Sequence, residues 1–175
     1  MISCHRIIKS FMTKQARDFS CITAPFPETI AREIRTWGQK NIPQIYLTGD
    51  GLENDIHVTC LYGIHNHDPL EIRPIIKGFG KFEITLGKIS VFENSEFDVV
   101  KIDVESAALR KLNGLLTKKL DNTNDYVYQP HCTIGYLKNG MGIRFVGNDT
   151  FKDRKVVIDN ILFSGNDYRE TVVPL

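Results

Sequence analysis

The chain has 175 residues, of which 42% are hydrophobic and 25% are charged, and this composition is that of a globular domain rather than of a mainly disordered chain. The formal net charge at pH 7 is only +1, so there is no broad basic field for holding long nucleic acids, and a small nucleotide suits the chain better than a duplex. No apolar run reaches the length of about 18 residues that a membrane helix needs, and the start lacks the apolar core of a signal peptide. We therefore expect a cytoplasmic protein without a membrane partner, in the host cytoplasm if it is viral.

The N-terminal part of the chain gives little structural signal. Residues 1–18 mix basic and apolar side chains without a clear period, and we expect an N-terminal extension to which the sequence assigns no role. Residues 19–175 are enough for one hydrophobic core and are expected to form a single domain with two lobes. This domain should begin with a strand over residues 19–24 and an amphipathic helix over residues 28–40, in which apolar residues recur at helical spacing.

A first motif strand follows a polar stretch. Residues 48–55 are rich in Gly, Asp and Asn and are predicted to be a solvated loop. The apolar strand that follows, residues 56–63, contains His57-Val58-Thr59. Successive side chains of a strand point to opposite faces, so His57 and Thr59 should share one face.

The second half of the chain is predicted to repeat the pattern of strand, helix and motif strand. A long strand over residues 81–92 should bend or bulge at Gly87, where the alternation of apolar residues changes parity. The order of elements predicts an α+β fold. The remaining elements are expected to be a hairpin partner over 97–104, a leucine-rich helix over 109–120, a second motif strand over 128–137 and closing strands over 155–163 and 169–173.

The second motif, His131-Cys132-Thr133, repeats the His-x-Thr pattern of the first. One such histidine would most simply be a structural residue of a half-buried strand, but two matching motifs indicate a site. Two imidazoles on opposite sides of a phosphorus atom can act as general base and general acid, and the hydroxyls of Thr59 and Thr133 can hold the phosphate oxygens. The motifs therefore predict phosphodiester cleavage with His57, Thr59, His131 and Thr133 as the catalytic residues, without a metal ion or another cofactor.

A zinc site built from the motif histidines with Cys60 and Cys132 meets a geometric objection. Both cysteines lie at positions of opposite parity to the histidines, so they should point to the other face of the sheet. We expect them to be small buried residues behind the site, and we expect free thiols rather than a disulfide framework, because the cysteines lack close pairs. The chain also lacks the glycine-rich phosphate-binding motifs and the G-x-S-x-G motif of serine hydrolases.

Taken with their flanks, the two motifs resemble those of the two-histidine (2H) phosphoesterase superfamily. The first is closed by Leu61-Tyr62-Gly63, and the second is introduced by Tyr128-Gln129-Pro130. The superfamily includes 2′-5′ RNA ligase-like proteins, cyclic phosphodiesterases of RNA ends and viral enzymes that destroy oligonucleotide immune signals. The resemblance covers about residues 19–175. It implies a bilobal fold in which two pseudo-symmetric antiparallel sheets form a central groove, with helices on the outside.

The resemblance also implies a substrate class. The compact, nearly neutral chain is most similar to phage nucleases that cut cyclic oligonucleotides to block a CBASS-type defence, so we expect a cyclic oligonucleotide or another small nucleotide as the substrate. Two alternatives stay open: processing of RNA ends, as a 2′,3′-cyclic phosphodiesterase or a 2′-5′ RNA ligase-like protein, and sequestration of a nucleotide without catalysis. Tyr62 and Tyr136 each end a motif strand and are candidates for stacking on a base, although either could pack in the core. Lys88 and Lys138 are candidates for neutralising a phosphate.

Overall fold

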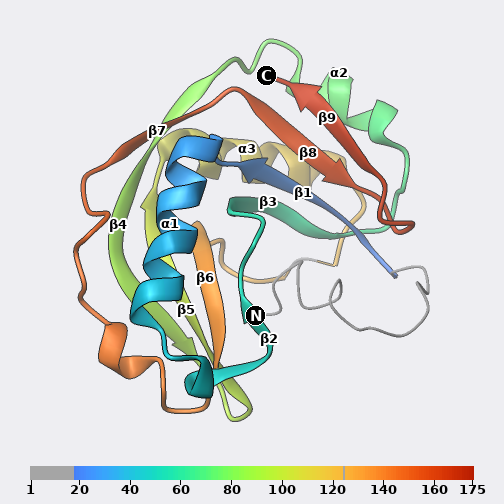
Figure 1. The fold of residues 1–175 in the computed structure, drawn as a ribbon. Helices are drawn as coiled ribbons and strands as arrows, with labels where there is room; N and C mark the ends of the chain where they lie inside the picture. Colours follow the sequence, from blue (N-terminus) through green and yellow to red (C-terminus); the bar gives the residue numbers. More distant parts are fainter. Residues whose placement is uncertain (1–17, 124) are drawn as a thin grey trace.

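The computed structural model describes residues 18–123 and 125–175 of the chain (Figure 1). The predicted extension over residues 1–18 lies outside the described residues, apart from Asp18. The helices are α1 (Glu28–Asn41), α2 (Ile72–Ile76) and α3 (Ala107–Lys119), with short 3-10 turns at Gln44–Tyr46, Pro69–Glu71 and Ile143–Phe145. The strands are β1 (Ser20–Pro25), β2 (Leu47–Leu52), β3 (His57–Ile64), β4 (Phe82–Glu93), β5 (Phe97–Glu105), β6 (His131–Lys138), β7 (Lys155–Ile158), β8 (Asn160–Ser164) and β9 (Glu170–Pro174).

The strands in the described part of the chain form one curved sheet in which every pairing is antiparallel. Their order is β7-β4-β5-β6-β3-β1-β8-β9, and β2 pairs with β6 outside this path. Four strands ending at the motif strand β6 form one half, and four beginning at the motif strand β3 form the other (Figure 1). The predicted bilobal α+β fold is confirmed, and the two expected sheets are the halves of one continuous sheet.

The region over residues 155–163, predicted as one strand, is divided between the two halves. β7 pairs with β4 in one half, and β8 pairs with β1 in the other. Asp159 separates them, so the chain passes from one half of the sheet to the other at this residue (Figure 1). Periodicity alone cannot show such a division, because both pieces are extended and apolar.

The polar stretch after α1 is not the solvated loop that its composition predicts. Residues 47–52 form β2, which lies along β6 and pairs at Leu47 with Leu137 and at Leu52 with Gly135. A Cβ atom added to Gly135 would come within 3.0 Å of the Leu52 side chain, so a glycine in β6 permits this close approach. The strand depends on its partner rather than on its own propensity.

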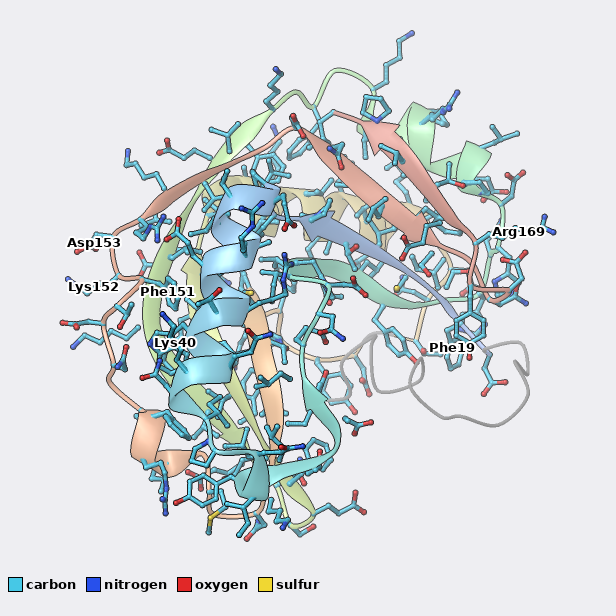
Figure 2. The ribbon with its side chains drawn as sticks, viewed as in Figure 1. Phe19, Lys40, Phe151, Lys152, Asp153 and Arg169 are labelled. Carbon is cyan, nitrogen blue, oxygen red and sulfur yellow. The ribbon has the colours of Figure 1, made fainter. Side chains whose placement is uncertain are left out.

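The main hydrophobic core lies between the helices and one face of the sheet. The buried faces of α1 and α3 contribute Ile30, Ile34, Leu109, Leu112 and Leu116 to it. Trp37 of α1 is partly buried and packs against this core. Its ring makes edge contacts with Phe145 and Phe151, each at 6.2 Å between centroids. Phe151 lies beside α1, next to the surface residues Lys152 and Asp153 (Figure 2). None of the helices in the described part of the chain has the length and apolar character that crossing a membrane requires.

The predicted bend in β4 is present, and a cap that the sequence analysis did not predict begins α3. The pairing of β4 with β5 shifts register between Leu86 and Ile89, where the bend at Gly87 was predicted. α3 begins earlier than its leucine pattern suggests, because the Ser106 side chain accepts a hydrogen bond from the Leu109 amide and caps the helix. The leucine stripe therefore identified the buried face of the helix but not its first residue.

Candidate active site

The two motif strands meet at one pair of residues. Val58 of β3 pairs antiparallel with Cys132 of β6, and both side chains are fully buried in the main core. The residues before and after each of them point to the opposite face of the sheet, which we call the motif face. In an antiparallel pair, residues directly across from each other have Cβ atoms about 5 Å apart. The facing pairs that follow from this register are His57 with Thr133 and Thr59 with His131.

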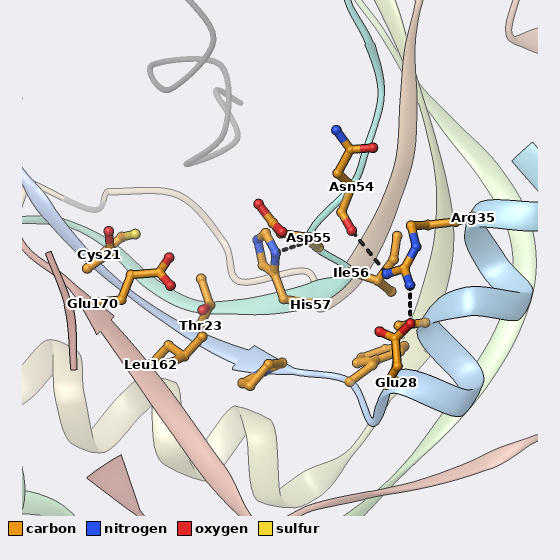
Figure 3. A pocket seen from close by; sticks show the side chains of 14 residues that line it. Cys21, Thr23, Glu28, Arg35, Asn54, Asp55, Ile56, His57, Leu162 and Glu170 are labelled. Atoms are coloured by element: carbon orange, nitrogen blue, oxygen red, sulfur yellow. Dashed lines mark hydrogen bonds and ion pairs between the residues drawn. The ribbon is translucent and has the colours of Figure 1, made fainter. Parts of the chain in front are cut away.

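Both motif histidines are held in the same way. Nδ1 of His57 lies 2.5 Å from the carbonyl oxygen of Asp55 (Figure 3), and Nδ1 of His131 lies 2.7 Å from that of Gln129. A carbonyl oxygen can only accept a hydrogen bond, so Nδ1 carries the proton in each ring. In the neutral form Nε2 is then an acceptor, and the charged form donates from the same atom. Each imidazole can therefore accept or donate a proton at Nε2.

The environment of His131 favours its neutral form. Burial lowers the pKa of His131, and the nearby Lys101 ammonium lowers it further. The hydrogen bond to Gln129 and the Asp103 carboxylate raise it, but the pKa remains below its ordinary value. A neutral imidazole is the form that can act as a general base.

Each motif strand carries a β-bulge three residues after its histidine. In β3 the partners of Ile22 and Thr23 are Leu61 and Thr59, so Cys60 is the extra residue. In β6 the partners of Val100 and Lys101 are Gly135 and Thr133, so Ile134 is the extra residue. A bulge shifts the alternation by one position. The residue five positions after each histidine therefore returns to the motif face; these residues are Tyr62 and Tyr136.

The carbonyl groups of both bulge residues are hydrogen-bonded. The Asn113 side chain of α3 donates to the Cys60 carbonyl at 2.8 Å, and the Glu53 amide donates to the Ile134 carbonyl at 2.8 Å. The Tyr128 hydroxyl donates to the Thr59 carbonyl at 2.9 Å, and burial raises the pKa of this phenol, which keeps it protonated as a donor. Buried carbonyl groups without partners would destabilise the bulges, so these bonds stabilise the shape of the motif strands.

The two tyrosines are in different surroundings. Tyr62 is partly exposed, faces Cys21 across the strand pair and makes an edge contact with Phe19 at 6.2 Å. Tyr136 is only 1% exposed and packs against Phe97 in a second, smaller hydrophobic cluster. Its ring has almost no exposed surface for a base, so the structure favours the core-packing alternative for Tyr136. Tyr62 keeps the surface that stacking would need.

A pocket of about 210 Å³ opens beside His57 (Figure 3). On one side it is lined by Thr23 and by residues of β8 and β9, including Glu170. On the other side Arg35 of α1 donates to the Asn54 carbonyl at 3.1 Å and to the Glu28 carboxylate at 2.6 Å. Arg35 thus joins α1 to the segment that leads into His57. The pocket therefore lies next to the first motif.

A lysine that sequence analysis did not select lies next to the second motif. Lys101 of β5 is 5% exposed and pairs across the strands with Thr133. Its alternation with Asp103 inside a predicted apolar strand was the signal available in the sequence. Lys88 and Lys138, which were selected, are both exposed.

Cys60 and Cys132 do not form a metal site with the motif histidines. Cys60 and Cys132 are free thiols, fully buried behind the motif face, and burial raises the pKa of Cys60 to about 12. Cys21 is disulfide-bonded, which corrects the expectation of free thiols for this residue. Among the described residues no group of three or more His, Cys, Asp or Glu side chains is placed to hold a metal ion.

Comparison with known proteins gives the family and the fold of the chain. The sequence model of the 2′-5′ RNA ligase superfamily matches residues 26–154, which is more than half of the chain. The chain belongs to this superfamily. A search of curated proteins found no match.

Solved structures of similar fold include three proteins of different sources. TT0787 of Thermus thermophilus is 13% identical, with 90% of this chain and 94% of that chain covered and a TM-score of 0.55. Escherichia coli LigT in complex with phosphate is 15% identical, with 92% and 96% covered and a TM-score of 0.56. Usb1 of Kluyveromyces marxianus with uridine monophosphate is 10% identical, with 91% and 99% covered and a TM-score of 0.57. These similarities show that the chain has the 2H phosphoesterase fold of the 2′-5′ RNA ligase superfamily.

Membership of the 2′-5′ RNA ligase superfamily supports an enzyme that acts on phosphodiester bonds of RNA-like substrates. The predicted resemblance to 2H phosphoesterases is thereby confirmed at the level of family and fold. The assignment of the four motif residues to catalysis, and of Tyr62 to base stacking, remains a prediction. So does the identity of the nucleotide.

Proposed function

We propose that the protein is a phosphodiesterase that cleaves ribonucleotide phosphodiester bonds by general acid–base catalysis with His57 and His131, without a metal ion. The observation that carries this proposal is the antiparallel register at Val58 and Cys132, which sets each motif histidine across from the threonine of the other motif. A phosphate bound between the strands would then meet one imidazole on each side and a hydroxyl next to each imidazole.

The proton transfers follow from the tautomers that the carbonyl groups of Asp55 and Gln129 select, in which Nδ1 carries the proton. One histidine is neutral, and its unprotonated Nε2 takes the proton of the attacking hydroxyl. The other histidine is charged and donates a proton from Nε2 to the leaving oxygen. We assign His131 as the base, because its pKa is lowered, and His57 as the acid. The hydroxyls of Thr59 and Thr133 donate to the non-bridging oxygens, where negative charge increases in the transition state.

We further propose that the substrates are small, and that cyclic oligonucleotide signals of the kind used in CBASS-type defence are the principal ones, in the cytoplasm. Two observations support a small substrate: the net charge of +1, and the pocket of about 210 Å³ beside His57. Solved structures of LigT with 3′-AMP and of Usb1 with uridine monophosphate show that proteins of this fold bind single nucleotides. In our proposal the pocket beside His57 holds one nucleoside, and Tyr62 stacks on a base.

A second candidate function is the processing of RNA ends. The observation that favours it is the match to the 2′-5′ RNA ligase superfamily over residues 26–154. A 2′,3′-cyclic phosphate at an RNA end presents the same phosphodiester chemistry as a cyclic oligonucleotide, so the motif geometry serves both substrates. The two functions differ in which substrate is turned over.

One experiment tests these functions together. The purified protein is incubated in excess EDTA with cyclic di- and trinucleotides, linear 2′-5′ and 3′-5′ oligoadenylates and 2′,3′-cyclic nucleotides, and the products are identified by mass spectrometry. We expect cleavage of the cyclic oligonucleotides. Cleavage of 2′,3′-cyclic nucleotides alone would show that RNA-end processing is the function and would reject cyclic oligonucleotides as the substrates. Loss of all activity on chelation would reject the metal-independent mechanism.

Matched variants connect the activity to the motifs. His57→Ala and His131→Ala should each lower turnover by at least about 10²-fold. His67→Ala, which removes a histidine bound to Ser20 outside the motifs, should leave turnover unchanged. Tight nucleotide binding without products in the wild-type protein would show that the protein sequesters its ligand.

A further inference from the structure

A buried lysine lies on the motif face next to the second motif. Lys101 pairs with Thr133, and two residues further along β5 Asp103 pairs with His131. The Lys101 side chain extends to neighbouring β4, where Nζ donates to the Ser90 hydroxyl at 2.6 Å. Nζ also donates to the Asp103 carboxylate at 2.5 Å. The ammonium is therefore fixed between β5, which flanks the motif strand β6, and β4, the next strand of the sheet.

An aromatic ring joins this lysine to the catalytic candidate. Nζ of Lys101 lies 4.1 Å from the centre of the Phe92 ring, and the His131 imidazole makes an edge contact with the same ring at 4.9 Å between centroids. An ammonium group over a ring face is stabilised by the ring quadrupole. Of its three N–H groups, two have hydrogen-bond acceptors among the described residues. An ammonium group has three N–H groups, so Lys101 has one more than these two acceptors use.

The charge is unequally distributed between the two halves of the sheet. At the corresponding positions of the other half, β1 sets Thr23 across from Thr59 and Pro25 across from His57. The counter-ion Asp103 has a side chain that is 50% exposed, whereas that of Lys101 is 6% exposed. Water screens the carboxylate more strongly than the ammonium, so Asp103 offsets the positive charge of Lys101 only in part. The two His-x-Thr motifs themselves supply no permanent charge.

We propose that Lys101 binds the substrate phosphate beside Thr133 and stabilises the negative charge that develops there during cleavage. This inference rests on the proposed function, which requires an anionic phosphate between the motifs. Lys101 supplies the positive charge that neither motif carries. Ser90 and Asp103 position the ammonium, and Phe92 shields it. Removing an ammonium group from water is unfavourable, and an anion bound beside it offsets part of this cost.

The test separates phosphate recognition from folding and from catalysis. Lys101→Met removes the charge but keeps a similar side-chain length, and Lys101→Arg keeps the charge. Lys111→Met is the matched control, because Lys111 also lies over a phenylalanine ring, that of Phe79, at 5.8 Å, but in helix α3. For each variant the dissociation constants of 3′-AMP and of adenosine are measured by calorimetry, together with kcat/KM.

We expect Lys101→Met to weaken 3′-AMP binding at least tenfold while adenosine binding is unchanged, and to lower kcat/KM by about 10²-fold, as for the loss of one donor to a developing oxyanion. Lys101→Arg should restore part of both, and the control should behave as wild type. An unchanged ratio of the two affinities in Lys101→Met would overturn the proposal. If that variant fails to fold, the doubly neutral Lys101→Met/Asp103→Asn replaces it, with the same expected ratio.

The outcomes also distinguish this proposal from the proposed function. If wild-type protein binds 3′-AMP through Lys101 but cleaves nothing, the phosphate site stands and the catalytic function fails. If wild-type protein cleaves its substrate and Lys101→Met does so equally well, the function stands and the role of Lys101 fails.

Discussion

The hydrogen bond between Asn113 and the bulge in β3 gives a prediction that links stability to the site. The Asn113 side chain is 9% exposed and donates to the Cys60 carbonyl at 2.8 Å. In Asn113→Ala this carbonyl is left buried without its donor, which costs about 1–3 kcal/mol in the free energy of unfolding. For a domain of this size the melting temperature should fall by about 2–4 °C for each kcal/mol lost.

The matched control is Asn41→Ala. The Asn41 side chain donates to the Trp37 carbonyl at the same distance, 2.8 Å, but at an exposed position. Water can replace the lost donor there, so the change in free energy should be within about 0.5 kcal/mol. Urea unfolding of both variants, followed by circular dichroism, measures the difference. Equal stabilities would refute the argument that the buried carbonyl needs this partner, and with it the view that α3 stabilises the bulge that turns Tyr62 to the motif face.

Three further predictions concern the site. His57→Ala and His131→Ala should each lower kcat/KM by at least about 10²-fold. The double variant should lose much less activity than the product of the two losses, because the histidines act as one unit. Near-normal turnover in either single variant would contradict the mechanism. The pH–rate profile should be bell-shaped. Lys101→Met should move its acidic limb to higher pH, because removal of the nearby positive charge raises the pKa of His131. A shift of this limb to lower pH would contradict the assignment of His131 as the base. Tyr62→Ala should weaken nucleotide binding about tenfold to hundredfold with little change in stability, whereas Tyr136→Ala should lower the free energy of unfolding by about 3 kcal/mol or more. Calorimetry and urea unfolding separate the two tyrosines, and the reverse pattern would show that their roles are exchanged.

The alternation of Lys101 with Asp103 indicates that they share one face of a strand, but sequence patterns do not show that Lys101 is buried next to the second motif. A lysine within an apolar strand is usually solvated, and the chain offered Lys88 and Lys138 as equally plausible choices. Lys101 is distinguished by its burial and by its three partners, of which Ser90 and Phe92 come from the neighbouring strand. Such contacts depend on strand register, which one sequence does not reveal.

Local periodicity was sufficient for most elements and for the identity of the motif residues. The alternation of side chains in a strand sets His57 and Thr59 on one face whatever the rest of the chain does, and the same holds for the second motif. The helical spacing of Ile30 and Ile34 likewise identifies α1, and the change of parity at Gly87 identifies the bend in β4. These features depend only on the geometry of a single strand or helix.

Features that depend on contact between distant segments were decided by the tertiary structure. Strict alternation would set Tyr62 and Tyr136 on the face opposite to their histidines, and the bulges at Cys60 and Ile134 reverse this. β2 forms because Gly135 lets it approach β6. A bulge or a strand of weak propensity is stable only when a partner satisfies its backbone groups. The sequence thus determined which side chains the site has, and the pairing of distant strands decided which of them meet there.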